Sequence, residues 1–243
     1  MTIYTLNPDK NFMDAIEILN RLNLNYLVLF GTLLGLIRDG ELIEWDKDVD
    51  IVCVFRSKDE VDKIINLFRK FGFKGGPQRR LKPIFPALVF FREGGRKIDI
   101  EFVQTFEKTC YLEWYSIYVS VNSQGEATFL NNMYRAISRL PFNEGIIGSS
   151  HYQENHILLA KFSYIFAKYI SFILKSALKL LNKDQKLIAE IPYECIKEKT
   201  TFNYHGKMCL IPKDPKCFLS FHYGQTWQKP IKSQRWTEYL KHK

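Results

Sequence analysis

The sequence predicts an α+β protein in which a mixed β-sheet is flanked by helices, followed by a helical C-terminal portion. Short apolar runs of strand length alternate with amphipathic stretches in the first half of the chain. Two of those runs carry acids at alternate positions, and the second half contains a long apolar stretch with regularly spaced lysines. The 243 residues are 46% hydrophobic and 25% charged, as in ordinary globular domains. We expect a core over residues 1–125 and a helical and C-terminal portion over residues 126–243 that packs on it and completes its site.

The N-terminal third begins with a helix and a buried strand. Apolar residues fall on one side of a helix over Asn11–Leu22. Tyr26–Phe30 is short and fully apolar, as in a buried strand. Gly31-Thr32 follows, and Leu33–Arg38 is predicted to form one or two helical turns. The chain therefore passes from a strand through a glycine step into a short helix.

A second strand and helix come next. Asp48–Phe55 begins with acids and continues as an apolar strand. Ser57–Phe71 is predicted to be a helix, because Ser57 is a good N-cap and Glu60 lies three residues later, as in a capping box. Phe71–Arg80 contains glycines and basic residues, and we expect it to be a loop.

A β-hairpin is predicted in the middle of the chain. Ala87–Phe91 and Lys97–Val103 are apolar runs of strand length, and Glu93–Arg96 between them contains two glycines suited to a turn. A further strand is expected over Tyr115–Ser120.

Two of the predicted strands carry paired acids. In a strand, alternate side chains project from the same face. Asp48 and Asp50 are therefore expected to share one face of their strand, and Asp99 and Glu101 one face of theirs. Such pairs also occur on solvated surfaces, but here the acids sit in apolar strands where isolated charges are costly. Carboxylates held side by side repel unless a cation lies between them. Hard oxygen ligands favour Mg²⁺ or Mn²⁺. The nearby Asp46 is an alternative ligand or a capping residue.

The layout resembles the nucleotidyltransferase fold, and two segments resemble the LicD family in particular. The first is Gly31–Arg38 followed by Ile43–Ile51, with Asp99 on a later strand. The second is C-terminal and consists of Ile211–Pro215, Phe218-Leu219, Tyr223–Trp227 and Pro230. The family comprises phosphocholine transferases of bacterial surface glycans, with fukutin-related ribitol-phosphate transferases as relatives. The chain departs from the pattern at Glu44 and Lys47, where the family often has proline and an acid.

The resemblance implies a set of functional residues. Asp48, Asp50 and Asp99 would bind the metal, Mg²⁺ or Mn²⁺, and would be catalytic, with Asp99 also a candidate general base. Glu101 competes for that role. Gly31 and Thr32 would position the phosphates of the substrate. Arg38 suits phosphate oxygens by its guanidinium geometry, or else forms a structural salt bridge.

The resemblance also implies a reaction and partners. The donor would be a CDP-linked alcohol, with phosphocholine as the first candidate for the group transferred. The acceptor would be a sugar hydroxyl of a cell-surface glycan such as lipopolysaccharide, or of its lipid-linked precursor. One alternative is a nucleotidyltransferase that moves NMP to a small molecule or a protein. Another is a non-catalytic module that binds membranes or anions. No aromatic and basic platform of the kind that binds nucleic acid is apparent.

The net charge of +9 suits anionic donors or an anionic bilayer. Residues 156–183 are predicted to be an apolar helix with lysines on one side, which either packs in a core, lies on a membrane surface, or forms a dimer interface. The lysines interrupt every window long enough to span a bilayer. The five cysteines show no CxxC pair, and the N-terminus has no secretory pattern. We therefore expect reduced thiols in a cytoplasmic protein, with peripheral contact at the inner face of the membrane.

Overall fold

The computed structural model describes residues 8–77, 87–116 and 185–230. The chain divides into two compact units, one formed by residues 1–112 and 189–243 and the other by residues 113–188. The predicted boundary between residues 125 and 126 lies outside the described residues. Most of the described elements belong to the first unit, which contains the predicted acidic strands.

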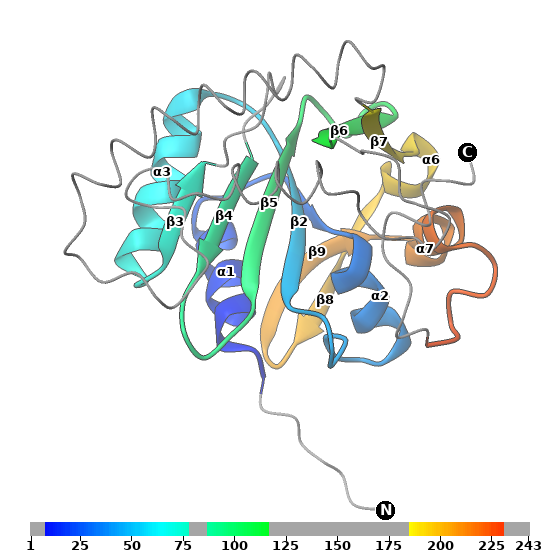
Figure 1. The fold of residues 1–243 in the computed structure, drawn as a ribbon, viewed down its shortest axis with the longest axis horizontal. Helices are drawn as coiled ribbons and strands as arrows, with labels where there is room; N and C mark the ends of the chain where they lie inside the picture. The colour runs from blue at the N-terminus through cyan, green and yellow to red at the C-terminus, as the bar shows by residue number, and fades with distance from the viewer. Residues whose placement is uncertain (1–7, 78–86, 117–184, 231–243) are drawn as a thin grey trace, which may run out of the picture. The chain divides into compact units, whose positions relative to one another are not determined.

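A five-stranded mixed sheet forms the centre of the first unit (Figure 1). Its strands, in spatial order, are β1 (Tyr26–Val28), β2 (Asp48–Val54), β5 (Lys97–Val103), β4 (Ala87–Phe91) and β3 (Lys74–Pro77). The central pair, β2 and β5, is parallel, and the other neighbours are antiparallel. The predicted α+β class is confirmed, and β4 and β5 have the bounds that the sequence predicted.

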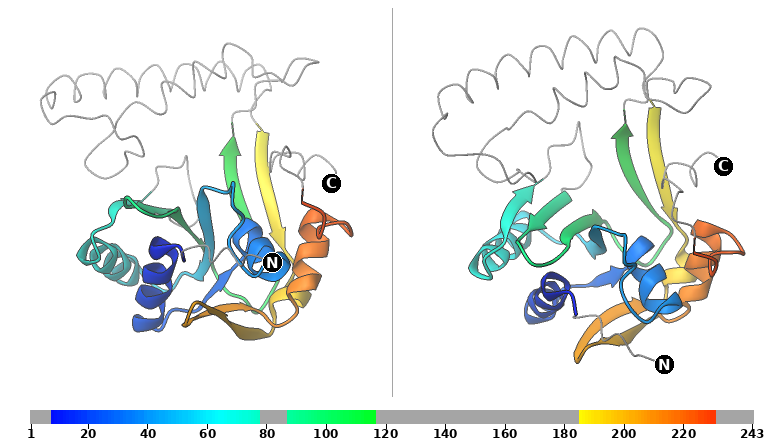
Figure 2. Two further views of the ribbon diagram at one scale, coloured as in Figure 1. Left: turned by 90° about the horizontal axis from the view of Figure 1, so that it is seen from below. Right: turned by 60° about the horizontal axis from the view of Figure 1, so that its bottom comes forward.

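Two helices cover one face of this sheet. Helices α1 (Lys10–Arg21) and α3 (Lys58–Lys70) contact each other and lie side by side (Figures 1 and 2). The ring of Phe68 on α3 stacks on Phe90 of β4 with centroids 4.0 Å apart. Ile98 and Ile100, which share that face, are fully buried. Because side chains alternate along a strand, the opposite face of β5 carries Lys97, Asp99 and Glu101.

The predicted start of α3 is confirmed, whereas the loop predicted over Phe71–Arg80 is wrong in part. The Ser57 side chain accepts a hydrogen bond from the amide of Glu60. Within the predicted loop, β3 pairs with β4. A Cβ added to Gly75, whose φ is 117°, would lie 2.1 Å from the carbonyl oxygen of Val89. Glycine is thus required for two backbones to come this close, and this strand has no side-chain pattern to reveal it.

The strand predicted over Tyr115–Ser120 begins five residues earlier in the structure. Strand β6 (Cys110–Ser116) pairs with β7 (Gln185–Ile191) in a two-stranded sheet. Its predicted end lies outside the described residues. The same is true of the apolar helix predicted over residues 156–183. None of the helices in the described part of the chain has the length and apolar character needed to cross a membrane.

The C-terminal residues of the first unit pack against its N-terminal elements. They form α6 (Tyr193–Ile196), the hairpin β8 (Lys199–Tyr204) and β9 (Lys207–Pro212), and α7 (Pro215–Tyr223). Strand β9 contacts β1 and α1, and α7 contacts α2 (Phe30–Arg38). Figures 1 and 2 show α7 beside α2. Elements from the N-terminal and C-terminal segments of the first unit therefore pack together, and α7 lies against α2.

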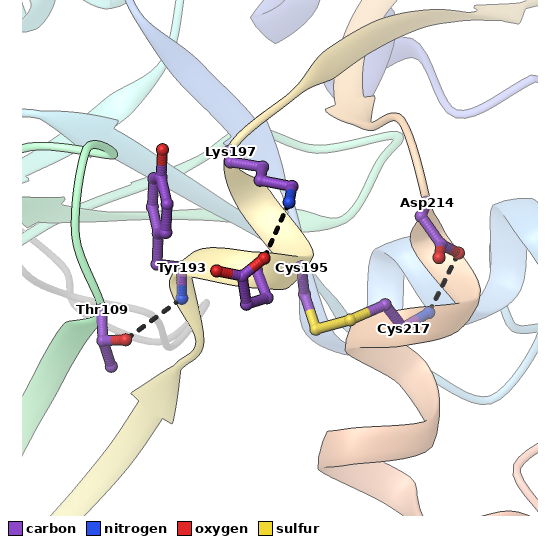
Figure 3. The surroundings of a disulfide bond; sticks show 7 residues. Thr109, Tyr193, Cys195, Lys197, Asp214 and Cys217 are labelled. Carbon is purple, nitrogen blue, oxygen red and sulfur yellow. Dashed lines mark hydrogen bonds and ion pairs between the residues drawn. A yellow bond between two sulfur atoms is a disulfide. The ribbon is translucent and has the colours of Figure 1, made fainter.

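A disulfide bond joins α6 to α7, which corrects the expectation that all five cysteines are reduced. Cys195 and Cys217 are bonded, with Cα atoms 5.2 Å apart (Figure 3). The other three, Cys53, Cys110 and Cys209, are buried free thiols. Disulfides are rare in reducing compartments. The cytoplasmic location was expected partly from reduced cysteines, and this bond removes that support.

Loss of the disulfide should lower the stability of the first unit. The bonded residues are 22 apart in sequence, and closing a loop of that size removes about 3 kcal/mol of chain entropy from the unfolded state. We expect the Cys195→Ala/Cys217→Ala double variant to lose about that much free energy of unfolding in urea. Peptide mapping without reductant should recover the two cysteines as one linked pair. Recovery of both as free thiols would contradict the assignment.

Asn11 ties α1 to the β4–β5 turn. Its fully buried amide donates to the carbonyl oxygens of Arg92 (2.7 Å) and Arg96 (3.0 Å) and accepts from Nε of Arg92 at 3.0 Å. A Cβ added to Gly95 would lie 2.6 Å from the Asn11 side chain. The Asn11 side chain therefore packs tightly against the β4–β5 turn, and its hydrogen bonds hold the start of β5 against α1.

Replacing Asn11 with alanine should destabilise the sheet. The change removes the hydrogen bonds of two backbone carbonyls and of a guanidinium N–H in a partly buried position, and each such loss costs about 1–3 kcal/mol where the group stays buried. We expect Asn11→Ala to lower the free energy of unfolding by at least about 2 kcal/mol, measured by urea denaturation. Asn66→Ala, at an exposed position of α3, serves as the control. Equal effects of the two substitutions would show that the Asn11 contacts contribute little.

Candidate functional site

Asp50 and Asp99 lie opposite each other on the two parallel strands. The register of β2 and β5 pairs Asp48 with Lys97, Asp50 with Asp99 and Val52 with Glu101. The acids thus project from the sheet face opposite α1 and α3. The sequence predicted that Asp99 lies on a strand near the first pair, and the structure places it directly beside Asp50.

Lys97 contacts two of these carboxylates. Its Nζ atom lies 2.6 Å from Oδ2 of Asp99 and 3.2 Å from Oδ2 of Asp48. The other oxygen of Asp99, Oδ1, is buried and has no hydrogen-bond partner among the described residues. A buried carboxylate oxygen without a partner is costly. Oδ1 of Asp99 therefore keeps an unused capacity to accept a hydrogen bond or to bind a cation.

The first turn of α2 is bonded to the acidic strand. The Thr32 hydroxyl, on a residue only 2% exposed, accepts a hydrogen bond of 2.8 Å from the amide of Asp50. Gly31 and Thr32 belong to the helix itself, rather than preceding it as predicted. Amides in a helix's first turn have no partner within the helix and favour an anion. These two predicted binding residues therefore lie beside Asp50.

The bend into α2 depends on a strained residue. Phe30 has φ of +52°, in the left-handed region that costs a residue with a side chain about 1–2 kcal/mol. Its ring packs on Phe218 (5.5 Å between centroids) and His222 (5.0 Å), both on α7. The C-terminal motif thus supports the turn that positions Gly31 and Thr32.

Asp46 also belongs to the cluster, although it was only an alternative in the sequence analysis. A Cβ added to Gly31 would lie 2.6 Å from Oδ2 of Asp46 and 3.7 Å from Oδ2 of Asp50. Glycine at position 31 therefore leaves space for two carboxylates. The Asp46 loop is fixed by Arg96, whose guanidinium donates to the carbonyl oxygens of Asp46 (2.9 Å) and Ile43 (2.8 Å). In the sequence, the glycine at position 31 is the feature that indicates a close neighbour such as Asp46.

Burial and neighbouring charges raise the pKa values of three of the carboxylates. Burial, followed by the charges of Asp48, Asp99 and Asp46, raises the pKa of Asp50 well above its usual range. Burial raises the pKa of Asp99 to about 6, although the ion pair with Lys97 opposes the shift. Burial and a hydrogen bond with Asp48 raise the pKa of Asp46 to about 6. The site thus concentrates more negative charge than Lys97 neutralises.

Arg38 and Glu101 lie further from the centre of the site than Asp50 and Asp99 do. Arg38 ends α2, six residues beyond Thr32, or about 9 Å along the helix axis. Its guanidinium pairs with both carboxylate oxygens of Asp39, at 2.8 and 2.6 Å. The structure therefore does not bring Arg38 beside Thr32. Glu101 shares the face of Asp99 one step further along β5, and its charge contributes to the raised pKa of Asp99.

The donor set suits a hard divalent cation, but the side chains are not closed around one. All of the clustered ligands are carboxylate oxygens, which Mg²⁺ and Mn²⁺ prefer. The partnerless Oδ1 of Asp99 and the mutual repulsion at Asp50 both call for positive charge. Across the described ranges, no three His, Cys, Asp or Glu side chains converge closely enough to hold a metal ion. The residues therefore suit a metal by their chemistry, while the Lys97 ammonium contacts two of them.

A mixed sheet with paired acids beside a glycine-containing helix start is the arrangement that the resemblance to the nucleotidyltransferase fold implied. The chain matches the model described as LicD/FKTN/FKRP, nucleotidyltransferase domain, over residues 23–144, which is half of its length. The chain belongs to this family. The match includes α2, β2 and β5, and therefore every central residue of the site. No curated protein matches the chain.

Two solved structures of the antibiotic-resistance factor ANT(2″)-Ia are similar to this chain at 9% identity. The solution structure has a TM-score of 0.29 and the match covers 71% of this chain and 93% of that one. The crystal structure, a complex with adenylyl-2″-tobramycin, has a TM-score of 0.28 with 70% and 96% covered. Similarity this low carries no argument about this chain.

The raised pKa of Asp46 predicts a pH-dependent effect of Asp46→Asn in the metal-free protein. Between pH 4 and 6, folded Asp46 keeps its proton while the unfolded chain releases it, since the pKa is about 6 only in the fold. The wild type should therefore lose stability as pH rises through this window, and the variant should lose less.

Urea denaturation at pH 4 and at pH 8, in the presence of a chelator, measures this difference. We expect Asp46→Asn to be more stable than the wild type at pH 8 and equal to it at pH 4. The exposed Asp62→Asn on α3 is the control. A variant that is less stable than the wild type at pH 8 would show that the charge of Asp46 is compensated in the fold.

Proposed function

We propose that the protein is a metal-dependent transferase that moves a phospho-alcohol, with phosphocholine the first candidate, from a CDP-linked donor. The acceptor is a sugar hydroxyl of a cell-surface glycan or its precursor. The observation that carries this proposal is the pairing of Asp50 with Asp99 on parallel strands, with Asp48 alongside. The Thr32 hydroxyl binds the same strand from the first turn of α2. Family membership supports the transferase class.

Asp48, Asp50 and Asp99 would hold Mg²⁺ or Mn²⁺. When bound, the metal supplies positive charge that neutralises the diphosphate of the donor. The amides at Gly31 and Thr32 bind a phosphate oxygen. The Thr32 hydroxyl accepts from the Asp50 amide, so its own hydrogen remains to be donated to the substrate.

The chain also has a group that can accept a proton from the sugar hydroxyl. The hydroxyl oxygen attacks the outer phosphorus of the donor, the bond from that phosphorus to the bridging oxygen breaks, and CMP leaves with the electron pair. Asp99 is the candidate base, because its Oδ1 is without a partner among the described residues and its pKa is about 6. At neutral pH it is ionised and can take the proton.

For Arg38 to bind a donor phosphate, it would have to release Asp39. Peripheral membrane contact through residues 156–183 would suit a lipid-linked acceptor, and binding of the protein to anionic vesicles tests it.

Release of CMP from CDP-choline tests the reaction. We expect the wild type with Mg²⁺ to form CMP and phosphocholine, with water replacing the sugar, and to act faster when an acceptor glycan is added. Asp50→Asn should lower the rate by at least about 100-fold, because a charge that stabilises the phosphoryl transition state is lost. Asp62→Asn, exposed on α3, should retain activity. Mass spectrometry of the products provides the measurement.

Different products would change the assignment. A panel of CDP-choline, CDP-ethanolamine, CDP-glycerol and CDP-ribitol identifies the alcohol. Release of pyrophosphate from an NTP, with NMP attached to the acceptor, would favour the alternative nucleotidyltransferase. Full activity of Asp50→Asn would contradict the role given to the carboxylates.

A further inference from the structure

Lys97 occupies a position that the reaction does not explain. It lies directly across from Asp48 in the β2–β5 register, one step before Asp99 on its own side of the strand. Its ammonium bridges Asp48 and Asp99, at 3.2 and 2.6 Å. The lysine therefore contacts two of the three carboxylates that would hold the metal.

The neighbouring arginine does not share this role. Arg96 donates its guanidinium hydrogens to the backbone carbonyls of Ile43 and Asp46. Within the described ranges, the ion pairs recorded for Asp48 and Asp99 are both with Lys97. The ammonium therefore supplies the positive charge at these two carboxylates when no metal is bound.

The Lys97 side chain can move away from Asp48 and Asp99 when another cation binds them. It is 38% exposed, so its ammonium can withdraw to water while its stem stays against the sheet. A lysine is a compact point charge on a flexible stem, whereas an arginine would bind the carboxylates in a fixed two-pronged geometry. A divalent ion carries twice the charge of the ammonium and can accept all three carboxylates as ligands.

We propose that Lys97 is a resident counter-ion that the catalytic divalent metal must displace from Asp48 and Asp99. It orients the two carboxylates and reduces their repulsion in the metal-free protein, and it lowers the affinity of the site for metal by competing with it. This inference rests on the proposed function, since it concerns the same metal site. It makes Lys97 a positioning residue that sets the metal concentration at which the enzyme becomes active.

Metal titration of variants tests the competition. The full-length protein is titrated with Mn²⁺ by calorimetry, as wild type, Lys97→Met and Lys97→Arg. We expect Lys97→Met to bind Mn²⁺ at least about tenfold more tightly than the wild type, because a like charge a few ångströms from the ion is removed. Lys97→Arg keeps that charge and should bind no more tightly than the wild type. Lys74→Met, at an exposed position of β3, is the matched control.

Thermal unfolding adds a readout that does not depend on turnover. Without metal, Lys97→Met should have a lower Tm than Lys74→Met, because Asp48 and Asp99 lose their counter-ion. Saturating Mn²⁺ should then raise its Tm more than it raises that of the wild type. Equal shifts in the two proteins would overturn the inference.

The wild-type protein offers a test that needs no substitution. Amine acetylation followed by mass spectrometry reports how accessible each lysine is. We expect Mn²⁺ to increase the labelling of Lys97 and to leave Lys74 unchanged. Unchanged labelling of Lys97 at saturating Mn²⁺ would overturn the displacement.

The outcomes separate this inference from the proposed function. If the wild type binds Mn²⁺ and transfers the phospho-alcohol, but Lys97→Met binds no more tightly, the role of Lys97 is wrong and the function stands. If neither protein binds Mn²⁺ or Mg²⁺, the displacement is overturned, and the metal is removed from the proposed function as well. Tight binding by Lys97→Met alone supports the inference.

Discussion

The site depends on repulsion between carboxylates that the backbone forces together. The parallel register of β2 and β5 places Asp50 against Asp99, and Asp48 and Asp46 add charge from the same side. Strand geometry leaves these side chains no other direction in which to project. Burial, followed by the charges of neighbouring carboxylates, raises the pKa values of Asp46, Asp50 and Asp99. A cation is therefore needed to offset the repulsion between these carboxylates, and the ammonium of Lys97 or a metal ion can supply that charge.

The C-terminal motif contributes structure to this site from the far end of the chain. Asp214 caps α7 by accepting from the amide of Cys217, and Pro215 begins the helix. Gly224, with φ of 82°, ends it, and Trp227 is buried shortly afterwards. The helix so defined packs on Phe30 at the strained entry to α2. Two segments far apart in sequence thus form one structural unit, and the disulfide bond joins it to α6.

Several features of the site and fold could be predicted from local sequence patterns, above all from the alternation of side chains along strands. The paired acids of β2 and β5, the hairpin between β4 and β5 and the cap at Ser57 all depend on local patterns that a sequence displays. Lys97 illustrates what a sequence hides, because its partner Asp48 is known only once β2 and β5 are in register. The same holds for Asp46, whose proximity to Gly31 depends on the loop that Arg96 fixes. Strand β3 escaped prediction because its glycines carry no pattern, and the disulfide because pairing depends on where α6 and α7 meet.

The proposed reaction requires a divalent cation to bind between Asp48, Asp50 and Asp99 and to support phosphoryl transfer there. Anomalous diffraction from crystals grown with Mn²⁺ and CDP-choline tests it most directly. We expect an anomalous peak within coordination distance of all three carboxylates and of the donor diphosphate, with the Lys97 ammonium withdrawn from Asp48 and Asp99. A donor bound elsewhere, or a donor bound here with no metal peak and Lys97 still between the two acids, would contradict it.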